Sequence, residues 1–175
     1  MALSSLRFAA AVSLALGSWL LPAPIAAADP GFPDVNAFAP VQLTGYISYL
    51  NADQQVVFST PDGVQCAYNY ILKGAANPAF FTNPQCSGNI PGIPASVPDN
   101  GGPGCARVWS TFPDNYGFDR HLGVCPPFPS QVLGVGQKIE TGNMTCVVGA
   151  GGVLGCIDPT KNHGFVIKPA GSWTF

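Results

Sequence analysis

Cysteines carry the clearest chemistry in this sequence. The chain has six of them, and their spacing suggests three local pairs: Cys66 with Cys86, Cys105 with Cys125, and Cys146 with Cys156. An even number of cysteines in a chain that begins like an exported protein favours disulfide bonds over metal ligation. Other connectivities are open to six cysteines. We favour the sequential pairing because it closes the shortest loops, and it leaves no thiol for catalysis.

A polar cluster at residues 114–121 (DNYGFDRH) holds the next candidates, Asp114, Asp119 and His121. Carboxylates and an imidazole at this spacing could ligate a metal ion. The same residues are also typical of a polar loop in which Asp and Asn stabilise turns. We favour the loop interpretation, so the sequence predicts no metal site and no cofactor.

Paired acids could hydrolyse a glycosidic bond. The candidates are Asp114, Asp119, Glu140 and Asp158, but the sequence alone does not place any two of them at the required separation. His163 precedes a glycine and is better explained as a turn residue or structural hydrogen-bond donor than as a catalytic base. The sequence contains no Gly-x-Ser-x-Gly motif to support an esterase. We therefore assign no catalytic residue and favour a non-enzymatic protein, while the question of an enzyme stays open.

Two hairpins are the firmest predictions of local structure. Residues 54–70 place apolar strand-forming runs on either side of Thr60-Pro61-Asp62-Gly63, a typical turn sequence. Residues 145–148 and 153–157 flank a glycine-rich segment. If Cys146 faces Cys156 across an antiparallel pair, the loop between the strands is 150–152.

Further strands are expected where apolar and polar residues alternate, or where β-forming residues cluster. They are 41–50, 105–112, 137–140 and 164–168. Trp109 is expected to anchor the core. The stretches 73–104 and 113–130, which are rich in Pro, Gly and polar residues, are predicted to be loops.

The fold class that follows is mainly β: a small antiparallel sheet or barrel-like domain of hairpins with long Pro/Gly-rich loops, stapled by three disulfides. The 21 glycines and 18 prolines among 175 residues argue against long helices. Residues 29–40 are predicted to form an extended N-terminal arm pinned by Phe32 and Phe38. Residues 41–175 are predicted to form a single domain.

Residues 1–28 resemble a cleavable signal peptide. Arg7 supplies a positive charge, an apolar run follows over 8–21, and the small residues of 26–28 suit a signal peptidase. The apolar run is too short for a typical membrane-spanning helix. No later segment of the sequence is long and apolar enough to cross a bilayer. The protein is therefore expected to be secreted or held in the cell envelope.

Several motifs resemble those of small exported or lipid-anchored envelope proteins of mycobacteria and related actinobacteria. They are FSTPDGVQC at 58–66, LGVGQKIE at 133–140, GNMTC at 142–146, GVLGC at 152–156 and HGFVI at 163–167. The resemblance implies a disulfide-bonded β domain outside the plasma membrane, and it implies no reaction. This chain differs from the lipid-anchored members in lacking a cysteine at the expected cleavage site.

The function expected from these features is non-enzymatic binding in the cell envelope or the extracellular space. The net charge of −2 gives no reason to expect nucleic acid as a partner. Recognition of an envelope or extracellular ligand is expected on the stretches 73–104 and 113–130, since loops on a rigid scaffold commonly bind ligands. The alternatives are a hydrolase acting on cell-wall glycan or ester, and a purely structural wall component. The ligand and the oligomeric state stay open.

Overall fold

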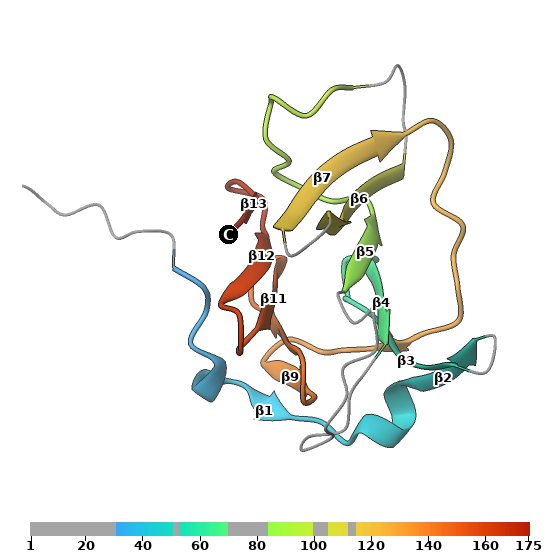
Figure 1. Cartoon of the computed structure of the whole chain (residues 1–175), viewed down its shortest axis with the longest axis vertical. Helices are drawn as coiled ribbons and strands as arrows, with labels where there is room; N and C mark the ends of the chain where they lie inside the picture. The colour runs from blue at the N-terminus through green and yellow to red at the C-terminus, as the bar shows by residue number, and fades with distance from the viewer. Residues whose placement is uncertain (1–30, 51–52, 70–83, 100–104, 112–114) are drawn as a thin grey trace, which may run out of the picture. The chain divides into compact units, whose positions relative to one another are not determined.

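The computed structural model describes residues 31–50, 53–69, 84–99, 105–111 and 115–175. These residues form two mostly antiparallel sheets and no α-helix (Figure 1), as the sequence predicts. The same ranges contain no helix with the length and apolar character to span a membrane. The predicted signal peptide lies outside the described residues.

The first sheet has six strands in the order β1-β9-β10-β11-β12-β13. Its strands are β1 (Ala39–Pro40), β9 (Gln137–Glu140), β10 (Thr145–Gly149), β11 (Val153–Asp158), β12 (His163–Ile167) and β13 (Trp173–Thr174). Neighbouring strands are antiparallel except for β1 and β9, which are parallel.

The second sheet has seven strands, six of them in the order β2-β3-β4-β5-β6-β7, with β8 parallel to β3. Its strands are β2 (Ile47–Leu50), β3 (Asp53–Ser59), β4 (Gln65–Asn69), β5 (Gln85–Gly88), β6 (Cys105–Thr111), β7 (Asn115–His121) and β8 (Gln131–Val132). Figure 1 shows β3 to β7 side by side in chain order, as expected for successive antiparallel connections.

Both predicted hairpins are confirmed. In β3 and β4, Phe58 faces Cys66, and the turn 60–64 connects the strands. In β10 and β11, Cys146 faces Cys156 and Gly149 faces Val153, which leaves 150–152 as the loop. Gly151 and Gly152 have φ angles of 71° and 73°, a region that glycine adopts without steric cost.

One hydrophobic core is shared by the two sheets, because alternate residues of each strand point inward. Val56 and Phe58 of β3 and Val108 of β6 come from the second sheet, and Leu154 and Phe165 come from the first. Across the sheets, the rings of Phe165 and Tyr116 meet edge to face with their centroids 5.4 Å apart. This contact joins β12 to β7.

The sequential disulfide pairing is confirmed for all six cysteines. Cys66–Cys86 crosses from β4 to β5 and Cys146–Cys156 from β10 to β11, and these four side chains are fully buried in the core. Cys105–Cys125 is partly exposed and ties the start of β6 to the segment that follows β7. Three disulfides indicate an oxidising compartment outside the cytoplasm.

Phe32 and Phe38 pin the N-terminal arm as predicted, although the arm is not extended throughout. The Phe32 ring lies 5.9 Å from the Phe175 ring and so close to Gly155 that a Cβ atom there would be 2.8 Å from it. Phe38 lies beside Gly149. Within the arm, residues Val35–Ala37 form a 3₁₀ turn, η1, and β1 then pairs with β9.

The predicted strand 41–50 is wrong in its first half. A 3₁₀ turn, η2 (Leu43–Tyr46), precedes β2, which begins at Ile47. Tertiary contacts override the alternating pattern here. Tyr46 is buried and donates its hydroxyl hydrogen bond to the Val132 carbonyl at 3.2 Å, and the backbone at Gly45 packs against Gln131.

Two predicted loops contain strands. The stretch 73–104 includes β5, and the stretch 113–130 includes β7. β5 is short and pairs on both sides, so its backbone hydrogen bonds compensate for its weak sequence pattern. β7 presents polar side chains on its outer face, which gives its sequence the composition of a loop.

The prediction that Trp109 anchors the core is also wrong. Val108 takes the inward position of β6, so Trp109 points outward and stays 37% exposed.

Candidate functional site

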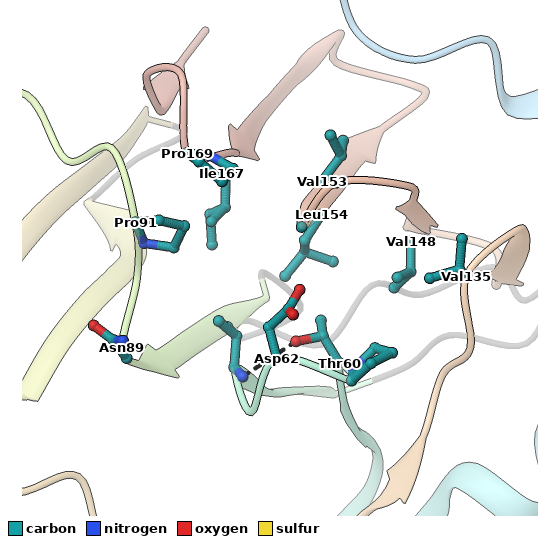
Figure 2. A pocket seen from close by; sticks show the side chains of 14 residues that line it. Thr60, Asp62, Asn89, Pro91, Val135, Val148, Val153, Leu154, Ile167 and Pro169 are labelled. Atoms are coloured by element: carbon teal, nitrogen blue, oxygen red, sulfur yellow. Dashed lines mark hydrogen bonds between the residues drawn. The ribbon is translucent and has the colours of Figure 1, made fainter.

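A groove of about 470 Å³ lies where turns of the two sheets meet. Its walls come from five parts of the chain: the β3–β4 turn, the segment after β5, the segment between β8 and β9, the β10–β11 hairpin and the end of β12. The volume is within the usual range for small-molecule sites. Figure 2 shows the side chains converging on this space from both sheets.

The floor of the groove is apolar. Val148, Leu154 and Ile167 line it, and each is at most 2% exposed. These three side chains also belong to the shared core. An apolar group that enters the groove would therefore contact the interior packing of the domain and leave water, which is favourable.

The rim of the groove includes the turn 60–64, whose own hydrogen bonds do not use the Asp62 carboxylate. The Thr60 N–H donates to the Val64 carbonyl at 2.8 Å, and the Gly63 N–H donates to the Thr60 carbonyl at 3.0 Å. The Thr60 hydroxyl oxygen accepts from the Val64 N–H at 3.2 Å. Backbone groups and Thr60 thus hold the turn closed.

Asp62 is directed into the groove (Figure 2). A Cβ atom on Gly152, in the opposing hairpin loop, would lie 3.2 Å from Asp62 Oδ2. The absence of a side chain at Gly152 keeps the space beside this carboxylate open. The site therefore combines an apolar floor with one exposed negative charge on its rim.

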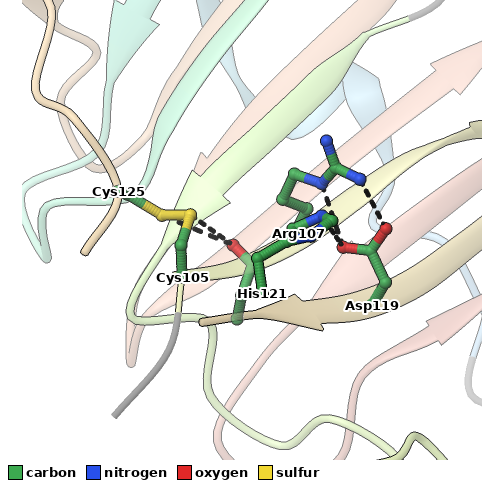
Figure 3. A network of polar contacts seen from close by, with 6 residues as sticks. Cys105, Arg107, Asp119, His121 and Cys125 are labelled. Atoms are coloured by element: carbon green, nitrogen blue, oxygen red, sulfur yellow. Dashed lines mark hydrogen bonds and ion pairs between the residues drawn. A yellow bond between two sulfur atoms is a disulfide. The ribbon is translucent and has the colours of Figure 1, made fainter. Parts of the chain in front are cut away.

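Two of the residues singled out in the sequence, Asp119 and His121, come together on the outer face of β7. Arg107 of β6 donates from Nε to Asp119 Oδ1 at 2.9 Å and from Nη2 to Oδ2 at 2.7 Å. His121 Nε2 lies 3.1 Å from Asp119 Oδ1. Figure 3 shows these side chains next to the Cys105–Cys125 disulfide. The Arg107 guanidinium also lies 5.5 Å from the centre of the Trp109 ring.

Arg107 favours the ionised form of Asp119. Partial burial alone would raise the pKa of Asp119, but the hydrogen bonds and positive charge of Arg107 outweigh it, with smaller contributions from His121 and Trp109. The pKa of the Asp119 carboxyl is therefore below its usual value. A bidentate pair with both oxygens engaged is a structural brace between β6 and β7.

We expect Asp119→Asn to lower the free energy of unfolding at neutral pH by about 0.5–1 kcal/mol. The contribution of ionised Asp119 is complete above the pKa of the unfolded chain, about 3.9. It is lost as the pH falls through the lower pKa of the folded state. Urea titrations at several pH values should show the wild-type and variant stabilities converging in acid, whereas a constant difference would contradict this assignment. Asp99→Asn, an exposed carboxylate, is the control for net charge.

The candidate acids Asp158 and Glu140 interact with residues close to them in the sequence, and both lie in a different sheet from Asp119. Asp158 accepts from the Thr160 N–H at 2.8 Å and from its hydroxyl at 2.6 Å, as a turn residue does, and His163 is its register partner in β12. Glu140 Oε2 lies 3.5 Å from Lys138 Nζ. Glu140 and Asp158 belong to the first sheet and Asp119 to the second.

Asp114 lies outside the described residues. Within them, no group of three or more His, Cys, Asp or Glu side chains is placed to hold a metal ion.

Sequence reasoning missed the groove. Asp62 was explained by turn chemistry, which does account for its position in the chain but not for the direction of its side chain. Of the stretches expected to bind a ligand, only 73–104 contributes, through Asn89 and Pro91. The sequence does predict the two turns that border the groove, 60–63 and 150–152. Nothing in the sequence indicates that these two turns approach each other.

Comparisons with protein-family models, with curated proteins and with solved structures found no match for this chain.

Proposed function

We propose that this chain is an exported, non-enzymatic binding domain of the cell envelope or extracellular space, and that it takes an apolar ligand into the groove. The observation that carries the proposal is the apolar floor formed by Val148, Leu154 and Ile167 at the open edge of the core. An oxidising compartment agrees with export through the signal peptide at 1–28.

The disulfides support a binding role because they make the walls of the groove rigid. Cys146–Cys156 lies within the β10–β11 hairpin, whose loop forms one wall, and Cys66–Cys86 fixes β4 and β5, which adjoin the opposite wall. A preformed site loses less conformational entropy when a ligand binds. The rigid scaffold thus favours recognition without a large rearrangement.

The test is a titration with a neutral apolar probe, octan-1-ol, followed by NMR of the methyl groups. We expect saturable shifts of the Val148, Leu154 and Ile167 methyl signals. Val135→Trp should weaken these shifts at least several-fold, because Val135 lines the groove and is 57% exposed, so the larger ring can cover the opening without disturbing the core.

Val132→Trp is the matched control, since Val132 is similarly exposed at 52% and does not line the groove. Absence of shifts at all three methyl groups in the wild-type chain would overturn the proposal. Equal weakening by both tryptophan variants would overturn the groove as the binding site.

A further inference from the structure

We propose that the natural ligand of the groove carries one cationic group beside its apolar body, and that Asp62 is the counter-ion. This inference rests on the proposed function and adds the charge of the ligand to it. Two observations support it: the type of ionisable side chain that borders the groove, and the position of the basic side chain that follows Ile167 in the sequence.

Asp62 is the sole ionisable side chain among the described residues that line the groove. Its carboxylate is not part of the hydrogen bonding that closes its own turn, and it faces the space between the two sheets. A carboxylate beside an apolar cavity attracts a positive group and repels a negative one. The remaining polar side chains of the lining, Thr60 and Asn89, carry no charge.

The basic residue that lies beside lining residues in the sequence, Lys168, has its ammonium held by another group. Lys168 lies between two lining residues, Ile167 and Pro169, but its ammonium is 4.6 Å from the centre of the Trp173 ring. A cation held over an aromatic face at this distance is attracted to the ring. The negative charge of Asp62 is therefore left for the ligand.

The geometry also provides room beside the carboxylate. Gly151 and Gly152 form the loop across from Asp62, and both have positive φ angles that other residues rarely adopt. A side chain at Gly152 would occupy the position next to Asp62 Oδ2. With no side chain at Gly152 to crowd it, the carboxylate can be approached by an ammonium group from the groove while an attached chain extends over Leu154 and Ile167.

The test compares three probes of equal length: octylammonium, octan-1-ol and octanoate. We expect octylammonium to bind about threefold to fivefold more tightly than octan-1-ol, the range of a partly exposed ion pair, and octanoate to bind more weakly than either. The preference for octylammonium should shrink as salt is added, because salt screens exposed charges.

Three variants separate the charge of Asp62 from other effects. Asp62→Asn should abolish the preference for octylammonium, and Asp62→Lys should reverse the order so that octanoate binds more tightly than octylammonium. Asp99→Asn makes the same change of net charge as Asp62→Asn at an exposed position away from the groove and should leave the order unchanged. Circular dichroism checks that each variant keeps the fold.

The outcomes distinguish this inference from the proposed function. Equal binding of octylammonium and octan-1-ol, unchanged in Asp62→Asn, would overturn the cationic ligand and leave the apolar groove standing. A preference that Asp99→Asn removes as fully as Asp62→Asn would overturn the role of Asp62. Failure of all three probes to shift the floor methyl groups would overturn both proposals.

Discussion

Phe165→Ala is expected to lower the free energy of unfolding by about 3–5 kcal/mol, the usual cost of removing a buried phenylalanine. Phe165 is fully buried in β12, and its ring meets Tyr116 of the other sheet. The substitution removes buried apolar surface and the contact between the sheets at the same place. Thermal unfolding should show a fall of roughly 10 °C or more in the melting temperature.

Phe175→Ala is the matched control for this substitution. Phe175 is 38% exposed and contacts Phe32 at the edge of the first sheet. It should cost less than half as much stability as Phe165→Ala, because less apolar surface is buried there. Equal losses in the two variants would contradict a core shared by β12 and β7.

Removal of the Cys146–Cys156 disulfide is expected to cost about 2–4 kcal/mol. The double variant Cys146→Ala/Cys156→Ala frees the two strands of the β10–β11 hairpin in the unfolded chain and leaves space in the core. Chemical denaturation of the oxidised wild-type and variant proteins measures the difference. Peptide mapping of the unreduced wild-type protein should find Cys146 linked to Cys156.

Cys105→Ala/Cys125→Ala provides the comparison. This disulfide closes a longer loop, but it is partly exposed and ties down a segment at the edge of the second sheet. Its removal leaves no cavity in the core, so we expect a smaller loss than at Cys146–Cys156. A larger loss would show that loop length, and not burial, governs the contribution of these disulfides.

The stability losses expected for Phe165→Ala and for removal of the Cys146–Cys156 disulfide do not depend on the ligand. They test the packing and cross-linking of the two sheets whose turns form the groove. If the two sheets are as rigid as two buried disulfides imply, ligand binding should involve little movement of the backbone.

The outer face of β7 differs from the groove. There, Asp119 and Arg107 satisfy each other, and the pair stabilises two adjacent strands without presenting a free carboxylate.

The hairpins were predictable because their signals are local. The turn at 60–63 and the glycines at 151 and 152 fix where the chain reverses, and alternation then decides which side chains point inward. The pairing of Cys146 with Cys156 was predictable for the same reason, since the two residues face each other as soon as the hairpin register is set. The other two pairs were favoured only because they close short loops. The resemblance to exported actinobacterial envelope proteins stays an expectation from sequence motifs.

The errors share a physical cause. The sequences of β5 and β7 show weak or polar alternation, which does not predict strands. Both form strands because their backbones hydrogen-bond to neighbouring strands. Residues 43–46 alternate like a strand, yet Tyr46 turns inward to reach Val132, a partner distant in the sequence. Contacts between distant segments can override local preference in this way.

The sequence by itself therefore determined the β class and the two hairpins and favoured the three sequential cysteine pairs, because each depends on residues close together along the chain. Only the tertiary structure decided the site. The groove exists because two turns from different sheets meet over the edge of a shared core, and because Asp62 is directed toward Gly152 and away from its own turn. Such an arrangement depends on how the sheets pack, and packing between distant strands is not encoded in the pattern of any one segment.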